Sequence, residues 1–404
     1  MNVRVTRNDR LYAGHRARYL VGPLDNMDDL PALRKRLQVI ASRGPQSRIG
    51  LIPDPSDVSW AFDRTAETVV VTEGPCLDVR EPARIIADFP VPTSRLTPMQ
   101  IHLAAPFLLF EFDHGLGGGR LMTELIAAIT SDSPGFADPP PACMAHRVGL
   151  RAFAHEVRTH PAAMARATDE LRRRSTPPVT NGAFDEPRQL VYAHSGVDFL
   201  TKLRARRDAT SPGVTILALV TASILRALNS VGIRTDPDIG VMVDLSRHLP
   251  AGVGTLSNFV GVAPIAVSPP FLASSIAAAM AEYTTGCRSL VRFGMATVAD
   301  MLHSPRGPVV QRCANRVAKL VVTDHGELAA AQKIRWQSDH DRLYLRFAPV
   351  GFSNQITLAT NRVGAQLHLS ASFYESQFDA RLIELALTRV VDTSDDVSAI
   401  GNCK

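Results

Sequence analysis

The sequence has no long uninterrupted apolar segment, and its first residues, MNVRVTRNDRLYAGH, carry charges without an apolar stretch behind them. A membrane-spanning helix needs about 20 consecutive, mostly apolar residues. A secretory signal peptide needs an apolar core after its positive charges. We therefore expect a cytoplasmic protein with no membrane span and no secretion signal.

Cysteine is scarce, and its spacing does not match the common metal-binding patterns. The five cysteines are Cys76, Cys143, Cys287, Cys313 and Cys403. Because they are scattered and odd in number, we expect reduced thiols in a reducing compartment. The segment HEVRTH places His155 and His160 one residue too far apart for the zinc-binding helix pattern. We therefore expect no metal and no permanently bound cofactor.

Positive charge is modest and dispersed. The formal net charge is +5, and aromatic residues make up 6% of the chain. The densest basic cluster, LRRRS at 171–175, has no aromatic residues between its arginines. Nucleic-acid binding usually requires a basic stripe or patch, so we do not expect a nucleic-acid partner. A mild positive field would suit an anionic partner, such as coenzyme A or an acidic carrier protein.

Length and proline content indicate two domains. The chain has 404 residues, and a single core rarely grows beyond about 250–300 residues. Two proline-bearing polar segments, at 131–142 and 175–188, must be loops, and we assign the second as the linker. The expected domains are therefore residues 1–180 and 190–404. Both halves mix strands and helices without regular βαβ alternation, which favours an α+β fold with mixed α/β layers.

The stretch FEFDHGLGGGRLMTELIAAI, at 110–129, predicts a strand, a glycine turn and an amphipathic helix. His114 lies at the end of the strand, where substrate can reach a side chain. A neutral imidazole there can act as a general base. It can equally be a core histidine bonded to backbone, and the residues alone leave both readings open.

Four ordered segments give the chain a family resemblance. They are HGLGGG at 114–119, VMVDLSRHLPAGVGTLSNFVGV at 241–262, KLVVTDHGEL at 319–328 and ITLATNRVGAQLHLSASFYESQFDA at 356–380. Together they resemble the chloramphenicol acetyltransferase-like superfamily. That group contains nonribosomal peptide condensation domains, polyketide-associated alcohol acyltransferases and coenzyme A-dependent acyltransferases. The first segment corresponds to the family's His-x-x-x-Asp-Gly motif.

The resemblance implies two acyltransferase-like subdomains in a V with a tunnel between them, and a crossover segment near 254–262. It makes His114 the general base. The residues it implies for the oxyanion or the site lining are Thr323, Gly118 and Gly119, with Asp113, His325 and Asn258 as further candidates. The acyl group would arrive as a thioester of coenzyme A or of a phosphopantetheinyl carrier protein. A small-molecule hydroxyl or amine would accept it, in specialised-metabolite or lipid assembly.

The motif departs from the family at one important position. Gly118 replaces the motif aspartate, and Ser246 stands where we align its usual arginine partner. Two alternatives to an acyltransferase therefore stay open. One is a catalytically degenerate protein that binds a carrier protein or another partner. The other is a family member that uses His114 for cyclisation or elimination.

Overall fold

The computed structural model of the chain describes residues 1–74, 82, 85–86, 97–131, 148–173, 186–302, 312–313, 317–337 and 342–392. Most of both proline-bearing segments lies outside these residues, as do Cys76, Cys143 and Cys403. Among the described helices, none is long and apolar enough to cross a bilayer.

The described residues of the first half form short strands, helices of different lengths and short 3₁₀ turns. Its elements are β1 (Asn2–Arg4), α1 (Arg7–Tyr12), β2 (Arg16–Gly22), α2 (Leu30–Ser42), η1 (Pro45–Ser47), β3 (Leu51–Ile52), β4 (Ser59–Phe62), β5 (Val69–Glu73), β6 (Met99–Ala104), β7 (Phe107–Asp113), η2 (His114–Leu116) and α4 (Gly119–Thr130).

The rest of the chain alternates longer helices and strands. Its elements are α5 (Val148–Thr159), α6 (Pro161–Arg173), β8 (Arg188–His194), α7 (Phe199–Thr210), α8 (Ile216–Ser230), β9 (Asp238–Asp244), η4 (Leu245–His248), β10 (Val260–Ala266), α9 (Ala273–Thr285), α10 (Arg288–Leu302), β11 (Lys319–Glu327), η5 (Ala329–Lys333), β12 (Leu343–Phe347), β13 (Gln355–Val363), β14 (Gln366–Tyr374) and α11 (Ala380–Asp392).

A five-stranded sheet forms the first layer, in the order β12-β2-β7-β6-β5. Every residue of β7 is buried, which explains its nearly continuous apolar sequence. Leucines and isoleucines on one side of α4 pack with α2 and this sheet in a single core, together with Phe110 and Phe112 of β7. A smaller sheet, β1-β4-β3, lies beside it. Strand, glycine turn and helix therefore follow one another as the sequence predicts.

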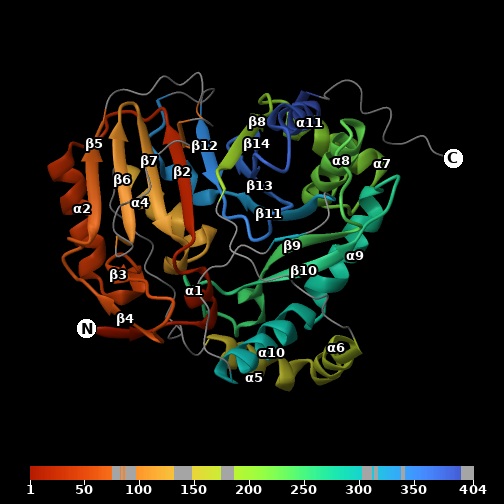
Figure 1. Cartoon of the computed structure of the whole chain (residues 1–404), viewed down its shortest axis with the longest axis horizontal. Coiled ribbons are helices and arrows are strands. Elements are labelled where there is room, and N and C mark those ends of the chain that lie inside the picture. The colour runs from red at the N-terminus through yellow and green to blue at the C-terminus, as the bar shows by residue number, and fades with distance from the viewer. Residues whose placement is uncertain are drawn as a thin grey trace.

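A six-stranded sheet forms the second layer, in the order β10-β9-β11-β13-β14-β8. Helices α8 and α11 pack against each other in the core of this layer. Figure 1 shows the two sheets side by side, with the first in red and orange except for its blue edge strand β12, and the second in green and blue. The expected mixed α/β fold with two layered halves is confirmed.

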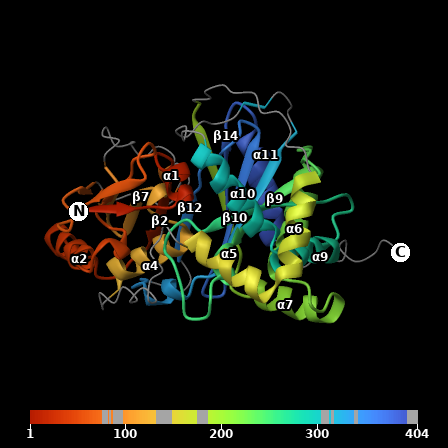
Figure 2. The same ribbon diagram turned by 90° about the horizontal axis from the view of Figure 1, so that it is seen from below.

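The two halves exchange elements, so their cores do not divide at residues 180–190. Strand β12 comes late in the sequence but pairs with β2 of the first sheet. Conversely, α5 and α6 pack against α10 and contribute to the core of the second half. Figure 2 shows these three helices together. Helices α5 and α6 and strand β12 therefore each pack with elements from the other side of the proline-bearing segment, because composition marks loops but not packing partners.

Candidate functional site

The turn that carries His114 is held by the aspartate before it. Asp113 ends β7, and its carboxylate accepts hydrogen bonds from the backbone N–H groups of Gly115, at 2.8 Å, and Gly14, at 2.9 Å. Burial raises the pKa of Asp113 to about 6, although these two hydrogen bonds act in the opposite direction. Asp113 therefore fixes the conformation of the turn from the side facing Gly14.

His114 is held by its backbone, while its ring leaves one nitrogen unpaired. Its N–H donates to the His15 carbonyl at 2.7 Å, and its carbonyl accepts from Asn258 Nδ2 at 2.8 Å. The imidazole stacks on Tyr12, with ring centroids 4.7 Å apart. Its Nδ1 is buried without a hydrogen-bond partner among the described residues. The crossover segment near 254–262 thus reaches the His114 turn through Asn258.

A buried ion pair lies beneath the same turn. Arg48 pairs with Asp9 at 3.1 Å, and both side chains are buried. The Arg48 guanidinium also donates to the carbonyls of Gly115 and Leu116. Asp9 in turn accepts from the backbone N–H of Asn258 at 2.9 Å. One ion pair therefore ties α1, the His114 turn and the crossover segment together.

The ion pair of the family motif is absent at the positions that the sequence aligns with it. Gly118 has room around it, since an added Cβ would meet only Asn258 Oδ1, at 3.7 Å. The Ser246 hydroxyl bonds to the Asp244 carboxylate instead, and Arg247 is exposed. The buried Asp9–Arg48 pair supports the turn instead, through the hydrogen bonds from Arg48 to its carbonyl groups.

Gly119 begins α4 and lies directly against His325. A Cβ at Gly119 would be 1.8 Å from His325 Cε1, so only glycine fits there. No side chain caps the N-terminus of α4, where Gly118 is the N-cap residue. The strand β11, which carries His325, therefore meets the start of the motif helix. His325 is partly buried rather than a solvated turn residue.

Thr323 lies two residues before His325 on β11. It pairs with Ala359 of β13, and the strand bulges between Asp324 and Glu327. Its side chain is partly buried. The described residues provide no hydrogen-bond partner for its hydroxyl.

Both histidines of this site are uncharged. The pKa of His114 is lowered to about 3, first by burial and then by the positive charge of Arg346. Burial, Arg346 and His114 together lower the pKa of His325 well below its usual value. Each imidazole is therefore neutral near neutral pH, and the lowered pKa makes it a weaker base than a free histidine in this state of the protein.

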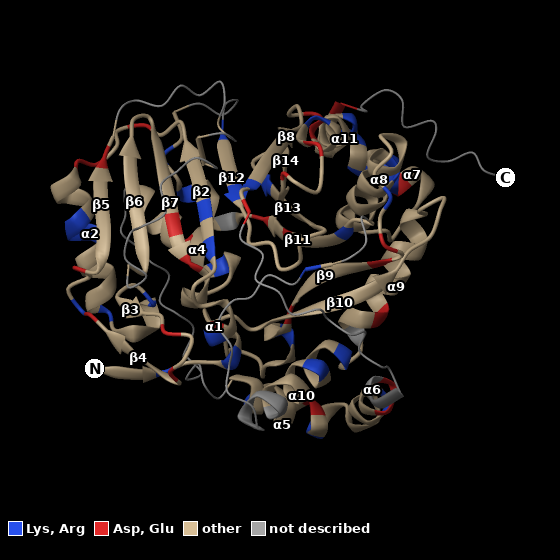
Figure 3. Cartoon of the chain, in the orientation of Figure 1, with Lys and Arg blue, Asp and Glu red and all other residues tan. Residues whose placement is uncertain are grey.

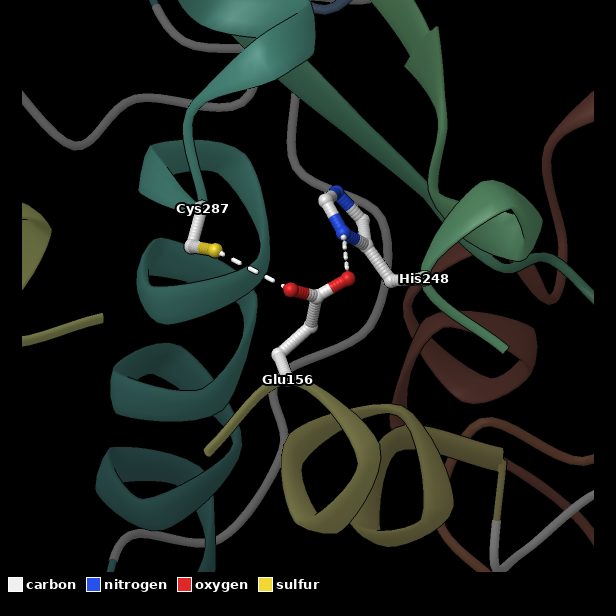
Figure 4. Close-up of side chains that lie close together, drawn as sticks. All are labelled: Glu156, His248 and Cys287. Carbon is white, nitrogen blue, oxygen red and sulfur yellow. Dashed lines mark hydrogen bonds and ion pairs between the residues drawn. The ribbon is translucent and has the colours of Figure 1, made fainter. Parts of the chain in front are cut away.

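A second cluster of chemically active side chains lies elsewhere, between α5, η4 and the start of α10 (Figure 4). Glu156 accepts from His248 Nδ1 at 2.9 Å, from His160 Nδ1 at 2.8 Å and from Cys287 Sγ at 3.5 Å. Ligand atoms of Glu156, His248 and Cys287 lie within 4.8 Å of one another, so these residues could hold a metal ion. Burial and the Glu156 charge raise the pKa of Cys287 to about 11, so its thiol keeps its proton. The mutual hydrogen bonds already account for this cluster as a structural network.

The sequence did not indicate several residues of either cluster. The pattern Thr6-x-x-Asp9 is a capping box at the start of α1, but nothing local links Asp9 to His114. Arg48, Arg346 and Tyr12 carry no motif. The three possible metal ligands, Glu156, His248 and Cys287, come from distant segments, so their spacing gives no metal-binding pattern.

Comparison with known proteins supports the fold. The sequence matches no family model, and no curated protein matches it either. Solved structures do match. A nonribosomal peptide synthetase, FmoA3, aligns with a TM-score of 0.62 at 15% identity, over 98% of this chain and 44% of FmoA3. This chain thus spans less than half the length of FmoA3.

Two single-domain structures align over nearly their whole length. The epimerization domain from the third module of tyrocidine synthetase B has a TM-score of 0.62 and 10% identity, over 98% of this chain and 95% of that domain. The trichothecene 15-O-acetyltransferase TRI3 from Fusarium sporotrichioides has a TM-score of 0.60 and 10% identity, over 97% and 94%. The chain therefore has the fold of condensation domains and related acyltransferases, as the resemblance implies.

Proposed function

We propose that this chain, which has the fold of condensation domains and related acyltransferases, transfers an acyl group from a thioester to a hydroxyl or amine. The observation that carries the proposal is His114 Nδ1, which lies at the end of β7 without a hydrogen-bond partner among the described residues. Its backbone is held on both sides, so the ring can act without the turn moving. A positioned base of this kind is what acyl transfer requires.

In the proposed reaction, His114 removes the proton from the acceptor as its oxygen or nitrogen attacks the thioester carbon. Negative charge then develops on the carbonyl oxygen, where hydrogen-bond donors stabilise it. The Thr323 hydroxyl and the backbone N–H groups of Gly118 and Gly119 are our candidates for this role. The carbon–sulfur bond breaks next, and the protonated His114 returns the proton to the leaving thiolate.

Coenzyme A or a phosphopantetheinyl carrier protein would supply the thioester. Acidic and basic residues are interspersed over both halves of the described chain (Figure 3). The +5 net charge therefore acts as a diffuse field, which favours the approach of an anionic donor without fixing a docking position. We place the reaction in specialised-metabolite or lipid assembly.

The test is to replace His114 by alanine and follow acyl transfer by intact mass with a panel of acyl thioesters and amine or alcohol acceptors. We expect the rate to fall by about 10²-fold or more, the usual contribution of a general base. The melting temperature should stay within a few degrees, because the backbone bonds of His114 remain. His160→Ala, which changes an exposed histidine, is the control. A His114→Ala variant with wild-type rates would exclude the proposed mechanism.

A protein that binds a carrier or another partner without catalysis is the second candidate. Two departures from the family motif favour this candidate. Gly118 stands in place of the motif aspartate, and Ser246 stands at the position aligned with the arginine that usually pairs with that aspartate. If the wild-type protein transfers no acyl group from any thioester yet binds the loaded carrier protein, this candidate replaces the first.

A further inference from the structure

Arg346 is a buried cation that has no carboxylate partner among the residues the structure describes. It lies on β12 opposite Tyr19 of β2, and only 6% of the residue is exposed. Its Nε and Nη1 atoms are buried without a hydrogen-bond partner, and no carboxylate among the described residues pairs with it. Its contact is with the Tyr19 ring, whose centroid lies 5.7 Å from Cζ. A buried charge that is left unpaired destabilises a folded protein.

Arg18 and Arg48 are buried in the same layer as Arg346, and each has the carboxylate partner that Arg346 lacks among the described residues. Arg18 pairs with Glu111 at 2.9 Å, and Arg48 pairs with Asp9 at 3.1 Å. Both are as deeply buried as Arg346. The fold therefore satisfies its buried guanidinium groups with carboxylates, and Arg346 is the exception among these three.

The unpaired guanidinium belongs to the site around His114. Tyr344, two residues before Arg346 on the same face of β12, hydrogen-bonds Thr123 of α4 at 3.0 Å, and Thr123 donates to the Gly119 carbonyl at 2.9 Å, so this face of β12 meets the start of α4. The charge of Arg346 also lowers the pKa of both His114 and His325. His325 packs on Gly119 at the uncapped N-terminus of α4, which also favours negative charge. His114 Nδ1, His325 Nε2 and the Tyr19 hydroxyl are also buried without hydrogen-bond partners among the described residues, and the Tyr19 ring lies against the guanidinium. An uncapped helix end, a buried cation and unsatisfied polar atoms thus lie on the elements that form this site.

We infer that this site binds a substrate that carries a carboxylate, and that Arg346 pairs with it. This inference rests on the proposed function for what then happens at His114. A carboxylate matches the planar fork of a guanidinium in a bidentate arrangement. The single negative charge of a carboxylate also balances the single positive charge of Arg346. A carboxylate seated there would cancel much of the field that Arg346 exerts on His114, which makes the imidazole a stronger base in the complex.

The carboxylate can belong to the acceptor or to the acyl group, and matched substrates separate the two. The acceptor pair is 3-hydroxybutanoate and 3-hydroxybutanamide, each with acetyl-coenzyme A. The donor pair is succinyl-coenzyme A and butyryl-coenzyme A, each with a neutral alcohol. In one pair we expect the charged member to be used about tenfold to a hundredfold better, the range given by one hydrogen-bonded charge. Arg346→Met should abolish that preference, whereas Arg381→Met, which removes an exposed arginine of α11, should keep it.

Binding is measured separately, so that it does not depend on turnover. Ligand-induced changes in melting temperature are recorded with 3-hydroxybutanoate, succinate and their amides on the wild type, Arg346→Met and His114→Ala. We expect the carboxylates alone to stabilise the wild type and His114→Ala, and to have no effect on Arg346→Met. If that pattern holds while no thioester supports transfer, the carboxylate site stands and the proposed acyl transfer fails.

The stability of the free protein provides a last check. Arg346→Met should melt at the wild-type temperature or above it, because it removes an unpaired buried charge. Equal use of charged and neutral members in both pairs, with carboxylates and amides stabilising the wild type alike, would overturn the inference. A large drop in the melting temperature of Arg346→Met would also overturn it, since that drop would mean that Arg346 already has a structural partner.

Discussion

Two adjacent glycines at the start of α4 have different structural roles. Gly119 leaves no space for a side chain, because its Cα faces the His325 ring. Gly118 has ordinary space around it, with a single neighbour at 3.7 Å. Position 118, which departs from the family motif, therefore has room for a side chain. Position 119, which agrees with the motif, does not. The constraint comes from a strand more than 200 residues away in the sequence.

Alanine at these two positions provides a matched pair. Gly119→Ala should displace His325, lower the melting temperature by several degrees and reduce acyl transfer, because overpacking typically costs about 1–3 kcal/mol. Gly118→Ala should unfold within a degree or two of the wild type. Adding His325→Ala to Gly119→Ala should recover most of the lost stability in a double-mutant cycle. Additive effects of Gly119→Ala and His325→Ala on the free energy of unfolding would show that the contact is not responsible.

At the scale of elements, the Glu156 network joins α5 to η4 and α10. Burial raises the pKa of Glu156, but hydrogen bonds from His248, His160 and Cys287 outweigh it and lower the pKa below its ordinary 4.5. A carboxyl whose folded pKa is lowered stabilises the protein at pH values above its unfolded pKa. That stabilisation is lost as the pH falls through the lowered value.

Glu156→Gln should therefore destabilise the protein near neutral pH and have little effect in strong acid. We expect a loss of about 1–3 kcal/mol at pH 7, the cost of leaving buried donors without their charged acceptor. Chemical denaturation of both proteins between pH 7 and pH 3 measures the difference. His160→Ala, on the exposed side of the network, should change stability much less. A melting temperature that rises with added Zn²⁺ and falls with chelator would instead identify the cluster as a metal site.

At the scale of the whole molecule, neither half contains its own complete core. The first sheet needs β12, which lies at 343–347, to cover the edge of β2. Helices α5 and α6 precede the expected linker but belong to the second core. The site is also built from both parts of the chain. Strand β12 contributes Arg346, and the crossover segment contributes Asn258.

Residues 1–180 expressed alone should therefore aggregate. They would expose an unpaired β2 edge and the apolar sides of α5 and α6, which normally lie in the second core. Coexpression with residues 186–404 should recover soluble, associated halves. Size-exclusion chromatography and binding of a hydrophobic dye measure both outcomes. A monomeric, dye-negative 1–180 fragment would mean that the first half folds independently of β12.

The sequence by itself determined the local elements and their order. Strand β7, its glycine turn and helix α4 follow from an apolar run, three glycines and a helical repeat, which act over a few residues. The same reasoning singled out His114, because it ends that strand, whereas Asn258 became a candidate only through the family resemblance. The ordered family segments added the two-layered fold. These features are readable because each depends on neighbours in the chain.

The tertiary structure alone decided what surrounds His114. Arg48, Asp9 and Arg346 have ordinary neighbours in sequence, and nothing local distinguishes them from other charged residues. Their roles come from burial: an arginine inside a core must meet a carboxylate or remain unpaired, and the fold decides which. The exchange of β12, α5 and α6 between the halves was equally hidden, since loop composition marks where the chain turns and packing decides where each element belongs.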